Sequence, residues 1–160
     1  MRKSGPVVLV LLLFFAFCVR ASARQPNDKL PTPTDPRRIT ADLVGHAHID
    51  LAWLWRWEET VRDIARHTFL GTLTQMEKMP GLTFAQSQAA VYDAVERDDP
   101  DLFQKIRLKI KEGTWIPVGG MWAEPDLNMP DGESLARQLL YGKRYFLDKF
   151  GVDVTVGGSP

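Results

Sequence analysis

The chain has 160 residues, of which 20 are basic, 20 are acidic and 44% are hydrophobic. This length favours one domain or part of one, and the hydrophobic share is ordinary for a globular core. Without residues 1–23, which hold three basic residues and no acidic one, 17 basic residues remain against 20 acidic ones and the net charge is −3. A slightly acidic chain gives no support for nucleic-acid binding.

Residues 1–23 have the three parts of a secretory signal peptide. Arg2 and Lys3 make a positive start, residues 7–17 are almost continuously apolar, and residues 21–23 (Ala-Ser-Ala) fit a small-residue cleavage site. The apolar run is short for a membrane-spanning helix of about 20 residues, which favours cleavage over an uncleaved anchor. We therefore expect export to the periplasm, the extracellular space or the secretory pathway, with no stable membrane insertion after cleavage.

Residues 24–40 are predicted to be a proline-rich linker. They contain Pro26, Pro31, Pro33 and Pro36 among polar residues. Proline lacks a backbone N–H and favours extended backbone before it, so a packed element is not expected here. The only cysteine, Cys18, lies in the predicted signal peptide, so the mature chain is expected to contain no disulfide.

Residues 41–160 alternate between strand and helix patterns. We expect strands at residues 41–46, 82–85, 114–118 and 152–156. We expect helices at residues 54–79, from 88 to 97, from 99 to 113 and from 131 to 151, where Asp99 and Asp131 are caps at the start and Gly113 and Gly151 end the helices. Helical connections of this length require parallel strands with right-handed crossovers. The predicted fold class is therefore α/β, as an incomplete barrel or an open sheet.

Apolar residues at helical spacing define the expected buried faces of the first and last helices. In the first helix, Trp57 begins a stripe that continues through Phe69 and Met76. In the last helix, the expected inward face consists of Leu135, Leu139, Tyr145, Phe146 and Phe150.

Residues that can bind metal follow the first predicted strand, in the run His-Ala-His-Ile-Asp at residues 46–50. In extended backbone His46, His48 and Asp50 project to the same side. Imidazole nitrogen and carboxylate oxygen both suit zinc, so we favour a metal site over histidines that only form local hydrogen bonds. The carboxyl ends of parallel strands share one edge. On that edge we also expect Gln86, Ser87, Trp122, Glu124 and Asp126.

Aromatic and acidic residues beside this run are candidate substrate contacts. Trp53 lies three residues after Asp50 and is predicted to be a platform for a sugar ring, whereas Trp55 and Trp57 are assigned to packing. Trp122, in the loop after the third strand, is a further candidate substrate contact. In the same loop, Glu124 and Asp126 are candidates for contacts to substrate hydroxyls. The alternative for both is hydrogen bonding within the loop.

Residues 44–55 resemble the opening signature of glycoside hydrolase family 38, the α-mannosidases. The agreement continues through residues 119–126 and through residues 132–135 with 138–144, so it covers nearly everything after residue 40. The resemblance implies a seven-stranded β/α barrel, of which residues 41–160 would be the front portion. It also implies a zinc-dependent, retaining glycosidase that removes terminal α-mannose from oligosaccharides or glycans.

The resemblance also assigns roles to single residues. It makes His48 and Asp50 zinc ligands, and Trp53 matches the tryptophan under the bound mannose. His46 matches a position that supports the ligands without binding the metal. In this family the zinc is understood to hold mannose hydroxyls rather than to activate water.

The catalytic carboxylates are expected outside this chain. A retaining glycosidase needs two carboxyl groups about 5 Å apart. The family's nucleophile would come directly after Pro160, and the acid/base carboxyl and the second histidine ligand further on. The resemblance therefore implies an N-terminal fragment of the catalytic domain, without a catalytic residue of its own and inactive alone.

Two other classes of protein remain open. A metal-dependent amidohydrolase also begins a barrel with His-x-His and uses zinc to activate water. That class gives no reason for Trp53 or for the loop at residues 122–126. A non-catalytic carbohydrate-binding module is suggested only by the missing nucleophile.

Overall fold

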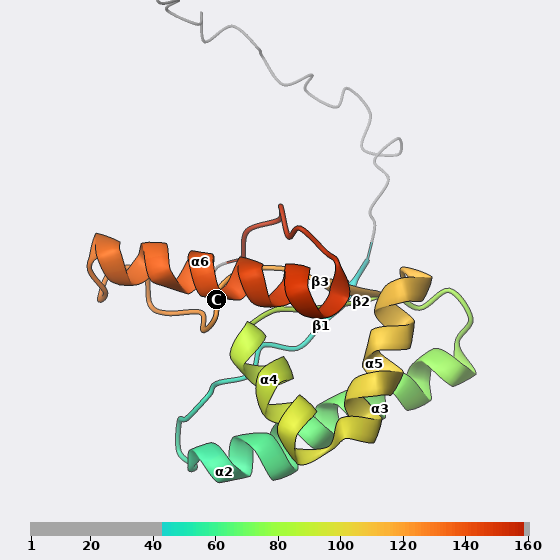
Figure 1. Cartoon of the computed structure of the whole chain (residues 1–160). Helices are drawn as coiled ribbons and strands as arrows, with labels where there is room; N and C mark the ends of the chain where they lie inside the picture. The colour runs from blue at the N-terminus through green and yellow to red at the C-terminus, as the bar shows by residue number, and fades with distance from the viewer. Residues whose placement is uncertain (1–42, 159–160) are drawn as a thin grey trace, which may run out of the picture. The chain divides into compact units, whose positions relative to one another are not determined.

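The computed structural model describes residues 43–158 (Figure 1). Its elements in chain order are β1 (Gly45–His46), α2 (Trp57–Glu59), the π-helical segment η2 (Thr60–Ala65), α3 (Arg66–Lys78), β2 (Phe84–Gln86), α4 (Ala89–Asp98), α5 (Pro100–Glu112), β3 (Trp115–Pro117) and α6 (Gly132–Phe150). The predicted signal peptide and the predicted linker lie outside the described residues.

The three strands form one parallel sheet in the order β1-β2-β3. Gly45 pairs with Phe84, and Phe84 pairs with Trp115. Parallel strands joined by helices confirm the predicted α/β class. The seven-stranded barrel stays an expectation from the family resemblance.

The predicted fourth strand, at residues 152–156, was wrong. In the described part of the chain this segment forms no ladder, although the Gly119 N–H donates to the Val156 carbonyl at 2.9 Å. Val154 is buried, so the apolar alternation that suggested a strand reflects side-chain burial against the core. At the start of the segment, the Val152 N–H donates to the Phe146 carbonyl and so completes the end of α6.

Helix ends lie where the capping residues predicted them. The Asp99 carboxylate accepts a hydrogen bond from the Leu102 N–H at 3.0 Å, and the Asp131 carboxylate accepts one from the Ser134 N–H at 2.7 Å. Gly113 ends α5 with a φ of 77°, a left-handed conformation that residues with a side chain rarely adopt. These caps are local, which is why the sequence was sufficient to predict them.

The first long helix begins later than predicted. It starts at Trp57 rather than near residue 54, and Trp57 is 41% exposed instead of beginning the buried stripe. From Ala65 onward the stripe is buried as expected, through Phe69 and Met76. The π-helical segment η2 lies between the two parts, and its wider turn shifts the residues before it out of the 3.6-residue period.

A cluster of aromatic rings forms the centre of the core. Trp115 of β3 lies edge-on to Phe69 and Phe84, with ring centroids 5.2 Å and 4.7 Å away. The Trp115 indole N–H donates to the Tyr92 hydroxyl at 2.9 Å, and this hydroxyl donates to the Gln86 carbonyl at 3.0 Å. Helix α4, which carries Tyr92, contacts η2, α5 and α6 and so joins the helices around this cluster (Figure 1).

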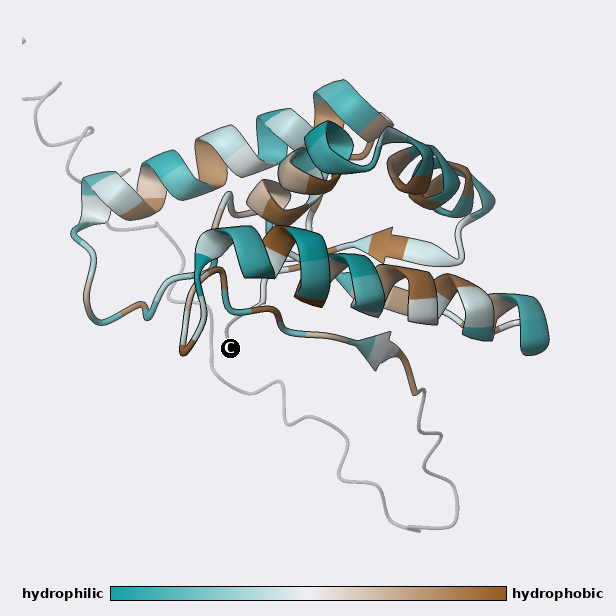
Figure 2. Cartoon of the chain, turned by 90° about the horizontal axis from the view of Figure 1, so that it is seen from below, coloured by the Kyte–Doolittle hydropathy of each residue, from teal (hydrophilic) through white to brown (hydrophobic). Residues whose placement is uncertain are grey.

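Helix α6 buries less of its predicted face than expected. Tyr145 and Phe146 are buried and Phe150 packs against the core, but Leu139 is 40% exposed. Hydrophobic and hydrophilic residues alternate in bands along the helices (Figure 2). Within residues 43–158, no helix combines the length and the hydropathy that crossing a membrane would need.

Candidate functional site

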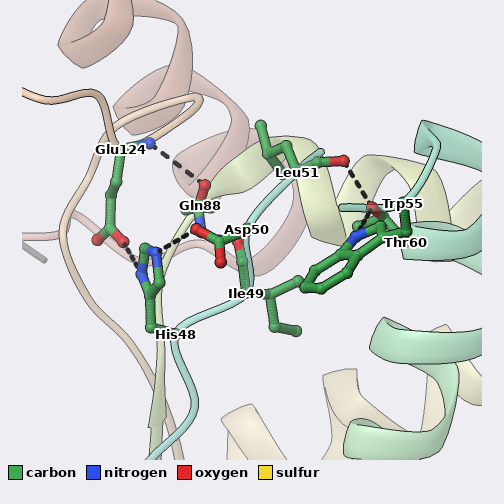
Figure 3. Close-up of polar contacts among 8 residues, drawn as sticks. All are labelled: His48, Ile49, Asp50, Leu51, Trp55, Thr60, Gln88 and Glu124. Atoms are coloured by element: carbon green, nitrogen blue, oxygen red, sulfur yellow. Dashed lines mark hydrogen bonds and ion pairs between the residues drawn. The ribbon is translucent and has the colours of Figure 1, made fainter. Parts of the chain in front are cut away.

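The chain directly after β1 places His48 between two carboxylates (Figure 3). His48 Nε2 lies 3.3 Å from Asp50 Oδ1, and His48 Nδ1 lies 3.3 Å from Glu124 Oε2. Ile49, between the two predicted ligands, is 2% exposed and belongs to the core. Because Ile49 is buried in the core, it anchors this segment. The neighbouring side chains of His48 and Asp50 are thereby held at the edge of the sheet.

The loop after β3 brings Glu124 to this place. Gly119 and Gly120 have φ angles of 77° and 71°, so the backbone turns sharply where β3 has ended. The Glu124 side chain is only 4% exposed. A Cβ on Gly119 would lie 2.8 Å from Glu124 Oε1, so a larger residue there would displace the carboxylate as well as strain the left-handed backbone.

Gln88 joins the two segments that carry these side chains (Figure 3). Its Nε2 donates to the Ile49 carbonyl at 2.7 Å, and its Oε1 accepts from the Glu124 N–H at 3.3 Å. The residue is 2% exposed and has a φ of 63°, a conformation that is unusual for a residue other than glycine. The sequence predicts that the polar end of β2 lies near the site, but it carries no signal for this bridge.

Gln86 and Ser87 are buried at the end of β2, with exposed fractions of 0% and 1%. Within the described chain, Gln86 Oε1 and Ser87 Oγ have no hydrogen-bond partner. Buried polar atoms of this kind are uncommon, because the lost hydration is not replaced. Both residues thus lie at the carboxyl end of β2, where they were expected.

The two predicted zinc ligands are neighbours, but they do not form a complete ligand set. Within residues 43–158, no group of three or more His, Cys, Asp and Glu side chains is arranged to hold a metal ion. Asp50 and Glu124 contact different nitrogens of the His48 ring, so the three side chains cannot converge on one point. His46 is exposed on β1, in register with Ala85, and its supporting role stays a prediction.

The predicted sugar platform lies on the bend between Asp50 and α2. Trp53 is 69% exposed, which leaves its ring accessible. The bend itself is anchored, because the Trp55 indole N–H donates to the Thr60 hydroxyl at 3.0 Å and this hydroxyl donates to the Leu51 carbonyl (Figure 3). Trp55 is partly buried and donates this hydrogen bond. Its predicted packing role and the role of Trp53 toward a sugar stay predictions.

The remaining predicted substrate contacts have partners within the chain. Trp122 lies edge-on to Tyr145 of α6, with ring centroids 5.9 Å apart. Asp126 Oδ1 accepts hydrogen bonds from the N–H and the side-chain amide of Asn128, at 3.0 Å and 3.2 Å. The Glu124 carboxylate faces His48. Contacts of Trp122, Glu124 and Asp126 with a substrate stay predictions.

Known proteins resemble this chain over most of its described length. The family model for the glycosyl hydrolases family 38 N-terminal domain matches residues 38–160. Alpha-mannosidase G of Dictyostelium discoideum is 45% identical over 112 residues, which are 70% of this chain and 10% of that protein. Alpha-mannosidase 2C1 of Homo sapiens is 44% identical over 112 residues, or 70% of this chain and 11% of that protein. An alpha-mannosidase of Saccharomyces cerevisiae is 43% identical over 110 residues, or 68% of this chain and 10% of that protein.

The matched region contains the whole arrangement described above: the His48–Asp50 pair, the loop that carries Glu124, and the bridging Gln88. The chain spans about a tenth of the length of the relatives it matches. On the family match and on these identities, the chain belongs to glycosyl hydrolase family 38, with residues 38–160 matching its N-terminal domain.

Proposed function

We propose that this chain is part of a zinc-dependent, retaining α-mannosidase that hydrolyses terminal α-mannosides of glycans. Family membership and relatives named alpha-mannosidases support this reaction class. The observation that carries the proposal is the contact of His48 Nε2 with Asp50 Oδ1 at 3.3 Å, three residues before the exposed Trp53.

The chemistry of the His48–Asp50 pair fits zinc. The imidazole nitrogen and the carboxylate oxygen are both donors that zinc accepts, and zinc sites in enzymes use three or more protein ligands. His48 and Asp50 would hold the ion together with ligands from outside the described residues. Bound zinc would supply positive charge that binds hydroxyl groups of mannose.

The residues of this chain would bind and orient the sugar. The Trp53 ring offers an apolar face on which the C–H face of mannose can stack. Trp122 and Asp126 would border the same sugar from the loop after β3. The family resemblance puts the nucleophile and the acid/base carboxyl outside the described residues, so we propose that hydrolysis needs the complete catalytic domain.

We also propose that residues 1–23 direct the protein out of the cytoplasm. The charged start, the apolar run and the Ala-Ser-Ala site support this proposal. The substrate would then be a mannose-containing glycan or oligosaccharide outside the cytoplasm or in the secretory pathway.

The test uses the protein expressed from its complete gene, with zinc, on an aryl α-mannoside and on a panel of cyclic amides. Mannoside turnover alone is the expected result. Amide hydrolysis without mannoside turnover would establish an amidohydrolase instead, and mannose binding without turnover would establish a carbohydrate-binding module.

Variants of the same protein test the ligand assignment. Asp50→Asn should lose bound zinc and turnover, because it replaces a charged ligand by a neutral one of the same shape. Asp101→Asn, on the exposed start of α5, is the matched control and should keep both. Full zinc content and normal turnover in Asp50→Asn would refute the assignment of Asp50.

A further inference from the structure

We propose that Glu124 is a positioning residue for His48: its carboxylate accepts the Nδ1–H of the imidazole and leaves Nε2 for a metal ion. A neutral imidazole carries one N–H, so the partner of one nitrogen decides which nitrogen can bind a metal. Glu124 Oε2 lies 3.3 Å from Nδ1 in an ion-pair contact, whereas Asp50 Oδ1, from the other proposed ligand, lies within hydrogen-bond distance of Nε2, also at 3.3 Å. The proposal rests on the proposed zinc site and deepens it.

The burial of Glu124 points to a role inside the protein. Its side chain is 4% exposed, and a carboxylate at that depth needs a partner because its hydration has been lost. Among the described residues, His48 is the ionisable side chain that lies within ion-pair distance of it. A contact with substrate hydroxyls would require an accessible carboxylate, as Asp126 has on the same loop.

The walls around Glu124 leave its carboxylate little freedom. Cβ atoms built on Gly119 and Gly158 would lie 2.8 Å and 3.3 Å from Glu124 Oε1, so the backbone of both glycines approaches one side of the carboxylate. The other oxygen, Oε2, is the one that faces His48. The close backbone on the Oε1 side and the ion-pair contact at Oε2 agree with the orientation that the positioning role needs.

Gln88 sets the spacing between Glu124 and the predicted ligands. Its side chain binds two backbone groups, the carbonyl of Ile49 and the N–H of Glu124. Ile49 itself lies between His48 and Asp50 in the sequence. Backbone strain like that of Gln88 persists where the surrounding contacts over-determine a conformation, and it clusters at functional sites. The segment after β1 and the loop after β3 are thus fixed relative to each other.

The experiment measures zinc itself in the protein expressed from its complete gene. Zinc affinity is determined by competition with a chromophoric chelator, and the ¹⁵N shifts of His48 report which nitrogen carries the proton and which binds the metal. Glu124→Ala should bind zinc about 10- to 100-fold more weakly, the loss expected when the partner of a ligating histidine is removed. Its Nδ1–H signal should broaden through exchange with water.

Two further variants make the result specific. Glu124→Gln keeps a hydrogen-bond acceptor of the same shape, so it should regain most of the zinc affinity that Glu124→Ala loses. A role that depends only on the negative charge of Glu124 would not predict this recovery. If Glu124→Ala does not fold, the ¹⁵N shifts of His48 in the wild-type protein decide alone, and a proton on Nε2 with metal bound through Nδ1 would contradict the proposal. Glu77→Gln, on the exposed face of α3, is the matched control and should leave both readouts unchanged.

The outcomes separate this inference from the proposed function. Unchanged zinc affinity in Glu124→Ala, with a raised KM for the mannoside, would overturn the positioning role and support a substrate contact instead. Metal bound through Nδ1 of His48 would overturn it as well. A wild-type protein that binds zinc with the expected dependence on Glu124 but hydrolyses no mannoside would overturn the proposed function alone. A wild-type protein without zinc affinity would overturn both.

Discussion

Gly142, where α6 crosses the loop that leads to Glu124, offers a quantitative test of how that loop is held. A Cβ at this position would lie 2.6 Å from the Trp122 nitrogen and would also collide with Met121 C and Gly120 O. All three are backbone atoms, which cannot rotate away as a side chain could. Gly142→Ala must therefore move α6 away from the loop.

The cost follows from the contacts that this movement breaks. The Trp122 N–H donates to the Gln138 carbonyl at 2.9 Å, and the Ala123 N–H donates to the Gln138 side chain at 2.8 Å. Overpacking costs about 1–3 kcal/mol, and weakening these hydrogen bonds adds about 1 kcal/mol. The better helix propensity of alanine offsets about 0.5–1 kcal/mol. We expect the free energy of opening at this crossing to fall by about 2 kcal/mol.

Amide hydrogen exchange in the complete protein measures this change at the affected amides. A fall of about 2 kcal/mol corresponds to a roughly 30-fold loss of protection at Trp122 and Ala123. The matched control is Gly71→Ala in α3, where an added Cβ would meet nothing within 4 Å and protection at these amides should stay unchanged. Equal protection in Gly142→Ala and wild type would refute the reasoning, because the close approach would then carry no energetic cost.

Three other predictions concern the core, the site and the N-terminus. Tyr92→Phe removes the buried hydroxyl between Trp115 and Gln86 and should lower the free energy of unfolding by about 1–3 kcal/mol in denaturant titrations. Burial raises the pKa of Tyr92, so the stabilising effect of its hydroxyl should be complete below the ordinary tyrosine pKa of about 10 and should decline as the pH rises above it. Alkaline unfolding that is equally steep in Tyr92→Phe and in the wild type would contradict this pH dependence. Trp53→Ala should raise the KM for an aryl α-mannoside while zinc content stays normal, and loss of zinc would mean that Trp53 supports the fold instead. Mass spectrometry of the exported protein should find Arg24 at its start, whereas an intact leader on a cytoplasmic protein would rule out the signal peptide.

The sequence alone was sufficient wherever the determining forces act over a few residues. The caps at Asp99 and Asp131 and the glycine ends of α5 and α6 depend on hydrogen bonds within one turn, so they could be assigned from residue type and spacing. The alternation of strand and helix patterns in turn required parallel pairing. The placement of His48 and Asp50 on one side of the chain is also a local feature, because residues two positions apart in extended backbone project to the same side.

The tertiary structure decided what depends on contacts between distant parts of the chain. The sequence marked Glu124 as a polar loop residue, but only folding shows its carboxylate buried against His48. The bridge made by Gln88 is likewise invisible until β2 lies beside both loops. Residues 152–156 have the apolar alternation of a strand, yet they form no ladder, because alternation records side-chain burial and a ladder needs a neighbouring backbone in register. Local pattern thus marked the candidate residues, and packing determined which of them meet.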